Sequence, residues 1–215
     1  MNIDIISDLI CPWCFIGKRR LERALAARPD LDVAISWRAY QLNPEMPPEG
    51  MDRAEYLAVK FGSPERAREI YGEIAAAGAS EGIDFAFDRI GRTPNTINAH
   101  RLIRLAAEKG LQHTVVDLLF RRYFLDGVDL GDDERLVEVA GEAGFDTAEV
   151  SAYLASDSGR DAIRLEEIHA RRLGVTGVPC FIIDQRFAVS GAQAPEVFVR
   201  IFETAEQALA TGQRA

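Results

Sequence analysis

The chain has 215 residues, of which 47% are hydrophobic, and it carries a formal net charge of −9. This length allows one large domain or two small ones, and the acidic balance argues against non-specific binding to nucleic acid or to an anionic membrane surface. Because the N-terminus shows no secretory signal pattern and no apolar run long enough to cross a bilayer is present, we expect a cytoplasmic protein that needs no membrane.

The first 40 residues predict a strand, a helix and a second strand. The run from Ile3 to Ser7 is rich in β-branched residues, which is typical of a short strand. From Pro12 to Ala27 apolar residues recur at helical spacing, and Arg28-Pro29-Asp30 ends the helix. The stretch from Val33 to Trp37 predicts the second strand, so the segment reads as β-α-β.

Two cysteines, Cys11 and Cys14, stand where this helix begins. Their spacing lets the sulfurs form a disulfide, and the helix N-terminus favours a thiolate at Cys11, which is the form that attacks disulfides. We therefore expect Cys11 to be the exposed, reactive member. Zinc is the alternative, but a structural zinc site normally needs four ligands, and no second cysteine or histidine pair has ligand spacing. We expect no metal, and we expect Lys18 and Arg19 in the following helix to be surface charges.

A loop rich in proline and glycine, from Asn43 to Gly50, marks a boundary. A long run of almost purely helical pattern follows it. Asp52 with Glu55 predicts a capping box, and Ser63 before Pro64 predicts a second helix start. Further helices are expected over residues 95–110, 115–125, 132–143 and 147–155.

Strand character returns near the end of the chain. A helix from Ser158 to Leu173 precedes two strands, Phe181 to Asp184 and Phe187 to Ser190, that predict a hairpin, and Pro195 to Leu209 predicts a closing helix. Without the helical block the order is β-α-β-α-β-β-α. This order predicts an α/β, thioredoxin-like fold with a small central mixed sheet flanked by helices. We assign residues 1–45 and 160–215 to that discontinuous domain and residues 46–159 to an all-helical insertion.

Several motifs together resemble the DsbA-like thioredoxin family, most closely its cytoplasmic FrnE-like branch. The strongest are Cys11-Pro12-Trp13-Cys14 after the first strand and the distant Gly177-Val178-Pro179 before the hairpin. The supporting segments are Trp37-Arg38-Ala39-Tyr40-Gln41-Leu42-Asn43-Pro44, Asn95-Thr96 with Ala99-His100-Arg101-Leu102, and Ser190-Gly191-Ala192-Gln193. The resemblance covers nearly the whole chain.

The resemblance implies a thiol–disulfide oxidoreductase in which Cys11 is the nucleophile and Cys14 the resolving thiol. Val178-Pro179 would be the cis-proline loop opposite the dithiol, where an extended substrate segment pairs with backbone. Pro12 and Trp13 would tune the reduction potential, and Trp13 either offers an aromatic surface to the substrate or simply packs. The reaction implies no cofactor beyond a redox partner such as glutathione or a dithiol protein, and its partners are protein or small-molecule thiols and disulfides.

Three further residues have two interpretations each. His100 could lie near Cys11 and stabilise its thiolate or shuttle a proton, or it could be a polar residue on a helix face. Cys180 follows Pro179 and is either a third thiol for mixed disulfides or a buried small hydrophobe. Asp8 either caps the motif turn or is a solvated loop acid.

Two other functions remain open at this stage. Glutathione transferases of the kappa class and 2-hydroxychromene-2-carboxylate isomerases belong to the same superfamily, although they typically carry serine at the position of Cys11. A non-catalytic, chaperone-like binding module is the second alternative. The sequence does not fix the substrate, the direction of exchange, the reduction potential or the oligomeric state.

Overall fold

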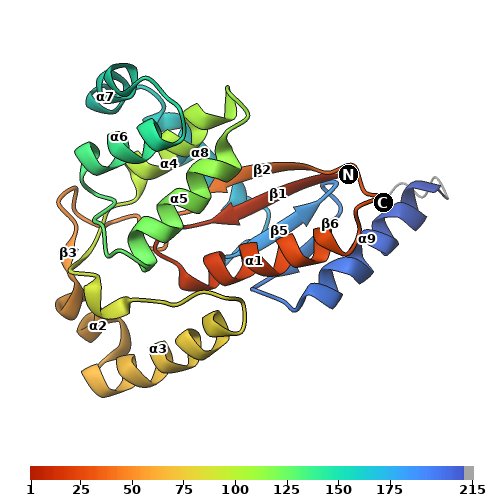
Figure 1. Ribbon diagram of the computed structural model, residues 1–215, viewed down its shortest axis with the longest axis horizontal. Coiled ribbons are helices and arrows are strands. Elements are labelled where there is room, and N and C mark those ends of the chain that lie inside the picture. Colours follow the sequence, from red (N-terminus) through yellow and green to blue (C-terminus); the bar gives the residue numbers. More distant parts are fainter. Residues whose placement is uncertain (211–215) are drawn as a thin grey trace.

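The computed structural model describes residues 1–210, and within them a mixed sheet of four strands lies between helices (Figure 1). The strands are β1 (Asn2–Ser7), β2 (Ala34–Ala39), β5 (Cys180–Ile183) and β6 (Phe187–Ser190), in the order β2-β1-β5-β6. β1 pairs parallel to β2 and antiparallel to β5, and β5 pairs antiparallel to β6. This topology confirms the predicted thioredoxin-like α/β fold.

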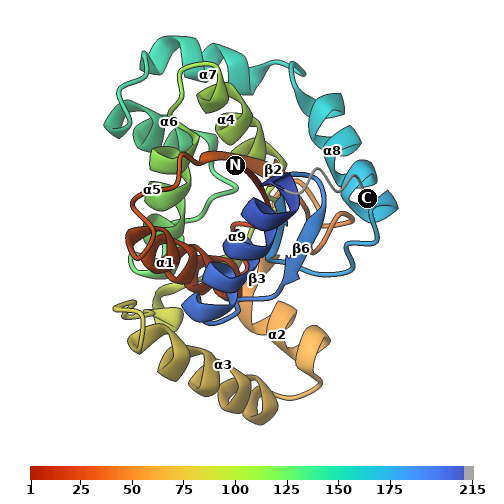
Figure 2. The ribbon, with the colours of Figure 1, turned by 90° about the vertical axis from the view of Figure 1, so that its right-hand side faces the viewer.

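Helices cover both faces of the sheet. α1 (Pro12–Ala26) packs with α9 (Pro195–Ala210) on one side, and α8 (Arg160–Arg172) lies on the other (Figure 2). Successive side chains of β5 point to opposite faces, as the geometry of a strand requires. Phe181 therefore packs edge-on against Phe198 of α9, with ring centroids 4.8 Å apart, whereas Cys180 packs with Ile6 and with Ala170 of α8.

Between β2 and α8 the chain forms two groups of helices (Figure 1). The first group is α2 (Arg53–Phe61) with α3 (Pro64–Ala79), and the second is α4 (Ile97–Ala107), α5 (Gln112–Phe124), α6 (Asp133–Glu142) and α7 (Thr147–Ala155). Asp52 and Ser63 are confirmed as N-cap residues, because Asp52 accepts from the Ala54 and Glu55 N–H groups and Ser63 accepts from the Arg66 N–H. The return bond of the predicted capping box, from the Asp52 N–H to the Glu55 side chain, stays a prediction. The division of the chain at residues 45 and 160 into two domains stays a prediction.

Three short elements in this region were not predicted. β3 (Met51–Asp52) pairs antiparallel with β4 (Arg92–Thr93), and a 3-10 turn, η1 (Phe87–Arg89), lies just before β4. Two-residue strands and a single turn are too short to show a periodic pattern. Within residues 1–210, no helix is long and apolar enough to cross a membrane.

Arg101 of α4 joins this helix to the C-terminal end of α7. Its side chain is fully buried, and its guanidinium donates to the backbone carbonyl oxygens of four residues. These four are Tyr153, Leu154, Ser156 and Ser158, at donor–acceptor distances of 2.7–3.0 Å. Carbonyl groups at a helix end have no partner within the helix, so Arg101 supplies the missing donors.

Candidate active site

The two cysteines of the Cys11-Pro12-Trp13-Cys14 motif lie at the start of α1, which follows β1 after a short turn. Cys11 is the N-cap residue and Pro12 occupies the first turn, where its missing N–H costs no helical hydrogen bond. The Cys11 N–H donates to the Asp8 carbonyl at 3.1 Å, and the Cys14 N–H donates to the Cys11 carbonyl at 3.0 Å. These bonds fix the turn that carries both thiols, and both cysteines are free.

The expectation that Cys11 is exposed is wrong. Cys11 is only 5% exposed and Cys14 only 1%, and the loop before β5 contacts the Cys11 sulfur. The exposed member of the motif is Trp13, at 38%. The indole ring is therefore the part of the motif that is most accessible from the surface.

The Val178–Pro179 peptide bond is cis and lies against the dithiol. The Cys11 thiol donates to the Val178 carbonyl oxygen at 3.5 Å. α1 approaches this loop closely at Gly17, where an added Cβ would lie 3.0 Å from Pro179 Cγ and 3.1 Å from Phe181 Cζ. The structure therefore brings two segments that are far apart in the sequence to either side of the Cys11 sulfur.

Cys14 lies behind Cys11, and its environment disfavours the thiolate. Burial first, and then the neighbouring Cys11, raise the pKa of Cys14 well above its ordinary value, while the Ser7 hydroxyl and the Asp8 backbone act in the opposite direction. Ser7 was missed from the sequence. The alternation of Ile3, Ile5 and Ser7 on one face of β1 was the signal that could have found it, because this face is the one that packs on α1.

Asp8 and His100 form a buried pair beside the motif. Asp8 is fully buried, so its interpretation as a solvated loop acid is wrong, and His100 is only 4% exposed. One Asp8 oxygen accepts from the Leu42 N–H at 2.7 Å, and the other lies 3.4 Å from His100 Nε2. Among the described residues, Ser7 Oγ, Asp8 Oδ1 and His100 Nε2 have no well-formed hydrogen bond. Buried polar atoms rarely lack partners. Here Ser7 contacts Cys14, and Asp8, whose backbone also acts on Cys14, lies against His100.

Cys180 does not face the dithiol. It packs with Ile6 and Ala170 on the α8 side of the sheet, while Cys11 and Cys14 belong to the core on the opposite side. Burial raises the pKa of Cys180. This placement favours its interpretation as a small buried hydrophobe over that of a third exchanging thiol.

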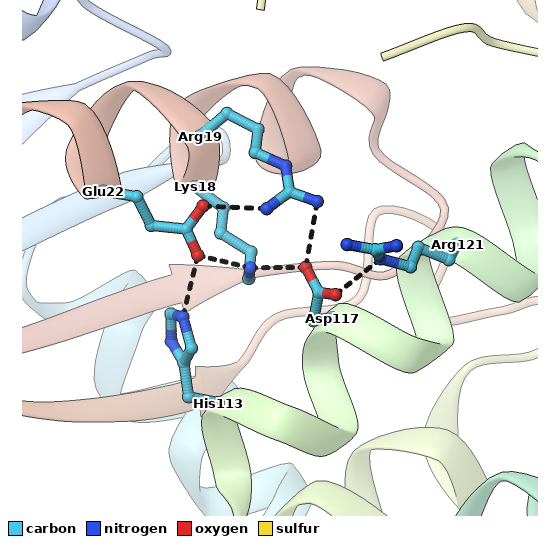
Figure 3. Close-up of polar contacts among 6 residues, drawn as sticks. All are labelled: Lys18, Arg19, Glu22, His113, Asp117 and Arg121. Atoms are coloured by element: carbon cyan, nitrogen blue, oxygen red, sulfur yellow. Dashed lines mark hydrogen bonds and ion pairs between the residues drawn. The ribbon is translucent and has the colours of Figure 1, made fainter. Parts of the chain in front are cut away.

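Lys18 is not a surface charge, which corrects a second expectation. Its side chain is 2% exposed, and its Nζ lies 2.6 Å from both Glu22 Oε1 and Asp117 Oδ1 (Figure 3). Arg19, which is one-quarter exposed, reaches the same two carboxylates, and His113 and Arg121 complete the cluster from α5. The cluster holds the helix that carries the dithiol against α5, and a buried lysine with two acids meets the rule that buried charges are paired.

The contacts of Glu22 in this cluster predict that the stability of the protein falls in acid. Burial acts to raise the pKa of Glu22, but hydrogen bonds with His113, Lys18 and Arg19 lower it from 4.5 to about 2. A carboxylate whose pKa is depressed by folding stabilises the protein above its unfolded pKa, and this contribution is lost as the pH falls through the folded value. We expect the Glu22→Gln variant to lose stability less steeply than the wild type between pH 4.5 and 2. Urea unfolding at several pH values measures the slopes.

The matched control is Glu69→Gln, which removes an exposed carboxylate paired with Arg66 on α3. Its acid dependence should follow that of the wild type. Parallel slopes for wild type and Glu22→Gln would contradict the role of this cluster.

Known proteins resemble this chain in sequence and in fold. The family model of the DSBA-like thioredoxin domain matches residues 2–203. A probable DsbA oxidoreductase from Streptomyces coelicolor is 37% identical with a TM-score of 0.87, covering 100% of this chain and 92% of its own. YwbO, an uncharacterized protein from Bacillus subtilis (strain 168), is 27% identical over 92% of this chain and 94% of its own.

Two more distant structures share the fold. The cytosolic disulfide reductase DsbM from Pseudomonas aeruginosa, solved with glutathione, is 19% identical with a TM-score of 0.67, covering 96% of this chain and 100% of its own. A 2-hydroxychromene-2-carboxylate isomerase is 15% identical with a TM-score of 0.71, covering 98% of this chain and 96% of its own. At these identities the likeness concerns the fold alone.

Proposed function

The chain belongs to the DsbA-like thioredoxin family, and from this premise we propose that it is a thiol–disulfide oxidoreductase with Cys11 and Cys14 as its redox pair. One observation carries the proposal. Two free thiols lie at the N-terminus of α1, and the outer one contacts the carbonyl of a cis-proline loop. A helix N-terminus stabilises a thiolate, and a thiolate is the nucleophile of disulfide exchange.

The reaction proceeds in two exchanges. The Cys11 thiolate attacks one sulfur of a substrate disulfide, forming a mixed disulfide and releasing the other substrate sulfur as a thiolate that takes up a proton. Cys14 then loses its proton and attacks Cys11 Sγ, so that a Cys11–Cys14 disulfide forms and the second substrate thiol leaves. Run in reverse, the same steps oxidise a substrate dithiol. After the forward reaction, two molecules of a thiol such as glutathione reduce the Cys11–Cys14 disulfide and leave as their own disulfide.

We propose that the residues around Cys11 position the substrate. We assign the backbone at Val178 to pairing with an extended substrate segment, which adds a short strand at the cis-proline loop. Pro12 and Trp13 complete the contact surface, since the indole is the exposed side chain of the motif. The glutathione-bound structure of DsbM supports glutathione as a thiol partner.

The second exchange needs a base because the Cys14 thiol is buried and its pKa is raised. We assign this role to the Asp8–His100 pair, whose facing oxygen and nitrogen lie 3.4 Å apart with no other partner among the described residues. The pair takes the Cys14 proton as the sulfur attacks, and the Ser7 hydroxyl stabilises the thiolate that develops.

This assignment predicts a split between the two exchanges. In Asp8→Asn and His100→Gln variants, resolution of the mixed disulfide should slow about tenfold or more, while the attack by Cys11 should change far less. Rapid-quench alkylation across a pH series measures the two rates separately. His113→Gln is the matched control, because this histidine is half-exposed and lies in the Lys18 cluster. Equal slowing of both exchanges would contradict the role of the pair.

The proposal is tested by equilibrating the protein in buffers with different ratios of reduced to oxidised glutathione. After acid quench and alkylation, peptide mass analysis counts free thiols at each cysteine. We expect Cys11 and Cys14 to change state together in one two-electron transition while Cys180 stays reduced. A pair that stays reduced in every buffer would overturn the proposal.

Variants of the two cysteines separate the isomerase-like, transferase-like and binding-module alternatives. An enzyme of that kind binds glutathione without dithiol cycling, so its activity would survive in a Cys14→Ser variant. A binding module would retain its partner in a Cys11→Ser/Cys14→Ser double variant. We further propose that the chain belongs to the FrnE-like branch and works in a reducing, cytoplasmic compartment, where such a pair would cycle as a catalyst.

A further inference from the structure

A cavity of about 470 Å³ lies between α2, α3 and η1, in the lower group of helices in Figure 1. Its wall is mainly apolar and includes Leu57 and Ala58 of α2, Ala67 and Tyr71 of α3, and Phe87. The volume falls in the range of sites that bind small organic molecules. Its residues come from helices that carry neither cysteine of the motif.

Arg53 is the unusual member of this wall, because it is a charged residue with only 7% of its surface exposed. Its Nη1 donates to Thr93 Oγ1 at 3.1 Å and its Nη2 donates to the Tyr71 hydroxyl at 2.7 Å. The guanidinium also lies 5.1 Å from the Tyr71 ring centroid. Its buried Nε has no hydrogen-bond partner among the described residues. A guanidinium has five N–H groups, so three remain for an acceptor.

No carboxylate forms an ion pair with Arg53 in the part of the chain that the structure describes, and its two hydrogen-bond partners are neutral hydroxyl groups. Burial raises the pKa of Tyr71, so its phenol keeps its proton and brings no negative charge. Arg68 of α3 is a second cation of the wall, but it pairs with Glu65 at 2.8 Å. Lys60 is not part of the wall and donates to the Tyr56 hydroxyl at 2.7 Å. Asp88 is the one acid of the wall and is exposed at its rim. Buried arginines are normally paired with an anion, and here the chain supplies none.

We propose that this cavity binds a small organic monocarboxylate with a compact apolar body, such as an arylalkanoic acid. The carboxylate is held by the free N–H groups of Arg53 and by the Tyr71 hydroxyl, whose oxygen already accepts from Arg53 and whose proton is free to be donated. The apolar body packs on Leu57, Ala67 and Phe87. Arginine and carboxylate match in charge and in their planar geometry, which selects the acid over its neutral amide.

Binding of 4-phenylbutyrate, followed by isothermal titration calorimetry, tests this site. We expect saturable binding of the acid, at least tenfold weaker binding of 4-phenylbutyramide, and no measurable binding of acetate, which lacks the apolar body. The same affinity is expected in a Cys11→Ser/Cys14→Ser double variant, because the site does not depend on the dithiol. If the redox proposal fails, the expected binding of 4-phenylbutyrate to this cavity is therefore unaffected.

Two variants locate the site. Arg53→Gln should weaken binding at least tenfold, and Ala58→Phe should block the cavity from an exposed helix position that tolerates a larger side chain. Their matched controls are Arg66→Gln and Val59→Phe, which lie on the same helices outside the cavity wall. If Arg53→Gln fails to fold, the binding of 4-phenylbutyrate to Ala58→Phe decides whether the acid occupies this cavity. Equal affinity for acid and amide, unchanged binding in Ala58→Phe, or competition by glutathione would overturn the proposal.

Discussion

If Cys11 is the nucleophile that we propose, a Cys11→Ser variant is expected to lose disulfide exchange by about a thousandfold or more, which is the scale expected when an enzyme loses its nucleophile. Serine has nearly the shape of cysteine, so it leaves the N-cap position and the packing against Val178 almost intact. It removes only the sulfur that we propose forms the mixed disulfide. Initial rates of reduction of a fluorescently labelled disulfide peptide, with glutathione as the reductant, measure the loss.

Cys180→Ser is the matched control for this prediction, because Cys180 is equally buried but packs on the α8 side of the sheet. Its exchange rate should stay within about threefold of the wild-type rate. This change is far smaller than the loss expected for Cys11→Ser. A large loss of exchange in Cys180→Ser together with a small loss in Cys11→Ser would contradict the prediction. It would indicate that Cys180, on the other face of the sheet, is the reacting thiol.

An Arg101→Ala variant is expected to lose about 4 kcal/mol of stability, the largest structural effect that we predict. The change removes a buried guanidinium and takes away the donor of the Leu154, Ser156 and Ser158 carbonyls. The Tyr153 carbonyl loses one donor but still accepts from the Ser156 N–H and hydroxyl. Each buried carbonyl left unpaired costs free energy comparable to a lost hydrogen bond. Urea unfolding followed by far-UV circular dichroism gives the difference in the free energy of unfolding.

Arg104→Ala provides the comparison on the same helix. Arg104 is about half-exposed and pairs with Glu166, so its loss should cost about 0.5 kcal/mol. Arg101→Lys should recover little of the stability, because an ammonium group cannot reach several carbonyls that a planar guanidinium reaches together. Equal costs for Arg101→Ala and Arg104→Ala would show that these buried hydrogen bonds do not hold α4 to α7.

Local signals in the sequence predicted the fold well where they acted over a few residues. Pro12 and the apolar spacing after it located α1, and Asp52 and Ser63 located the starts of α2 and α3, because capping depends on neighbouring backbone groups. The hairpin of β5 and β6 followed from two short apolar, strand-like runs on either side of a tight turn. The position of Val178-Pro179 against Cys11 came from the family resemblance, since no local rule joins segments 167 residues apart.

The errors concern residues whose environment is set by distant parts of the chain. Lys18 lies on a helix face that looked solvated, but Asp117, 99 residues later, supplies the partner that allows its burial. Asp8 is buried because Leu42 and His100 meet its carboxyl group. The same reason explains Arg53 and Arg101, whose buried positions depend on segments that the sequence does not show to be adjacent.

Mass analysis of a Cys14→Ser variant after incubation with a peptide disulfide tests the central claim most directly. Without the resolving thiol, the first exchange should stop at the mixed disulfide. We predict one substrate adduct per chain, on the peptide that contains Cys11, reversed by a strong reductant. An unmodified Cys11, or an adduct on Cys180 in its place, would contradict the assignment of Cys11 as the nucleophile.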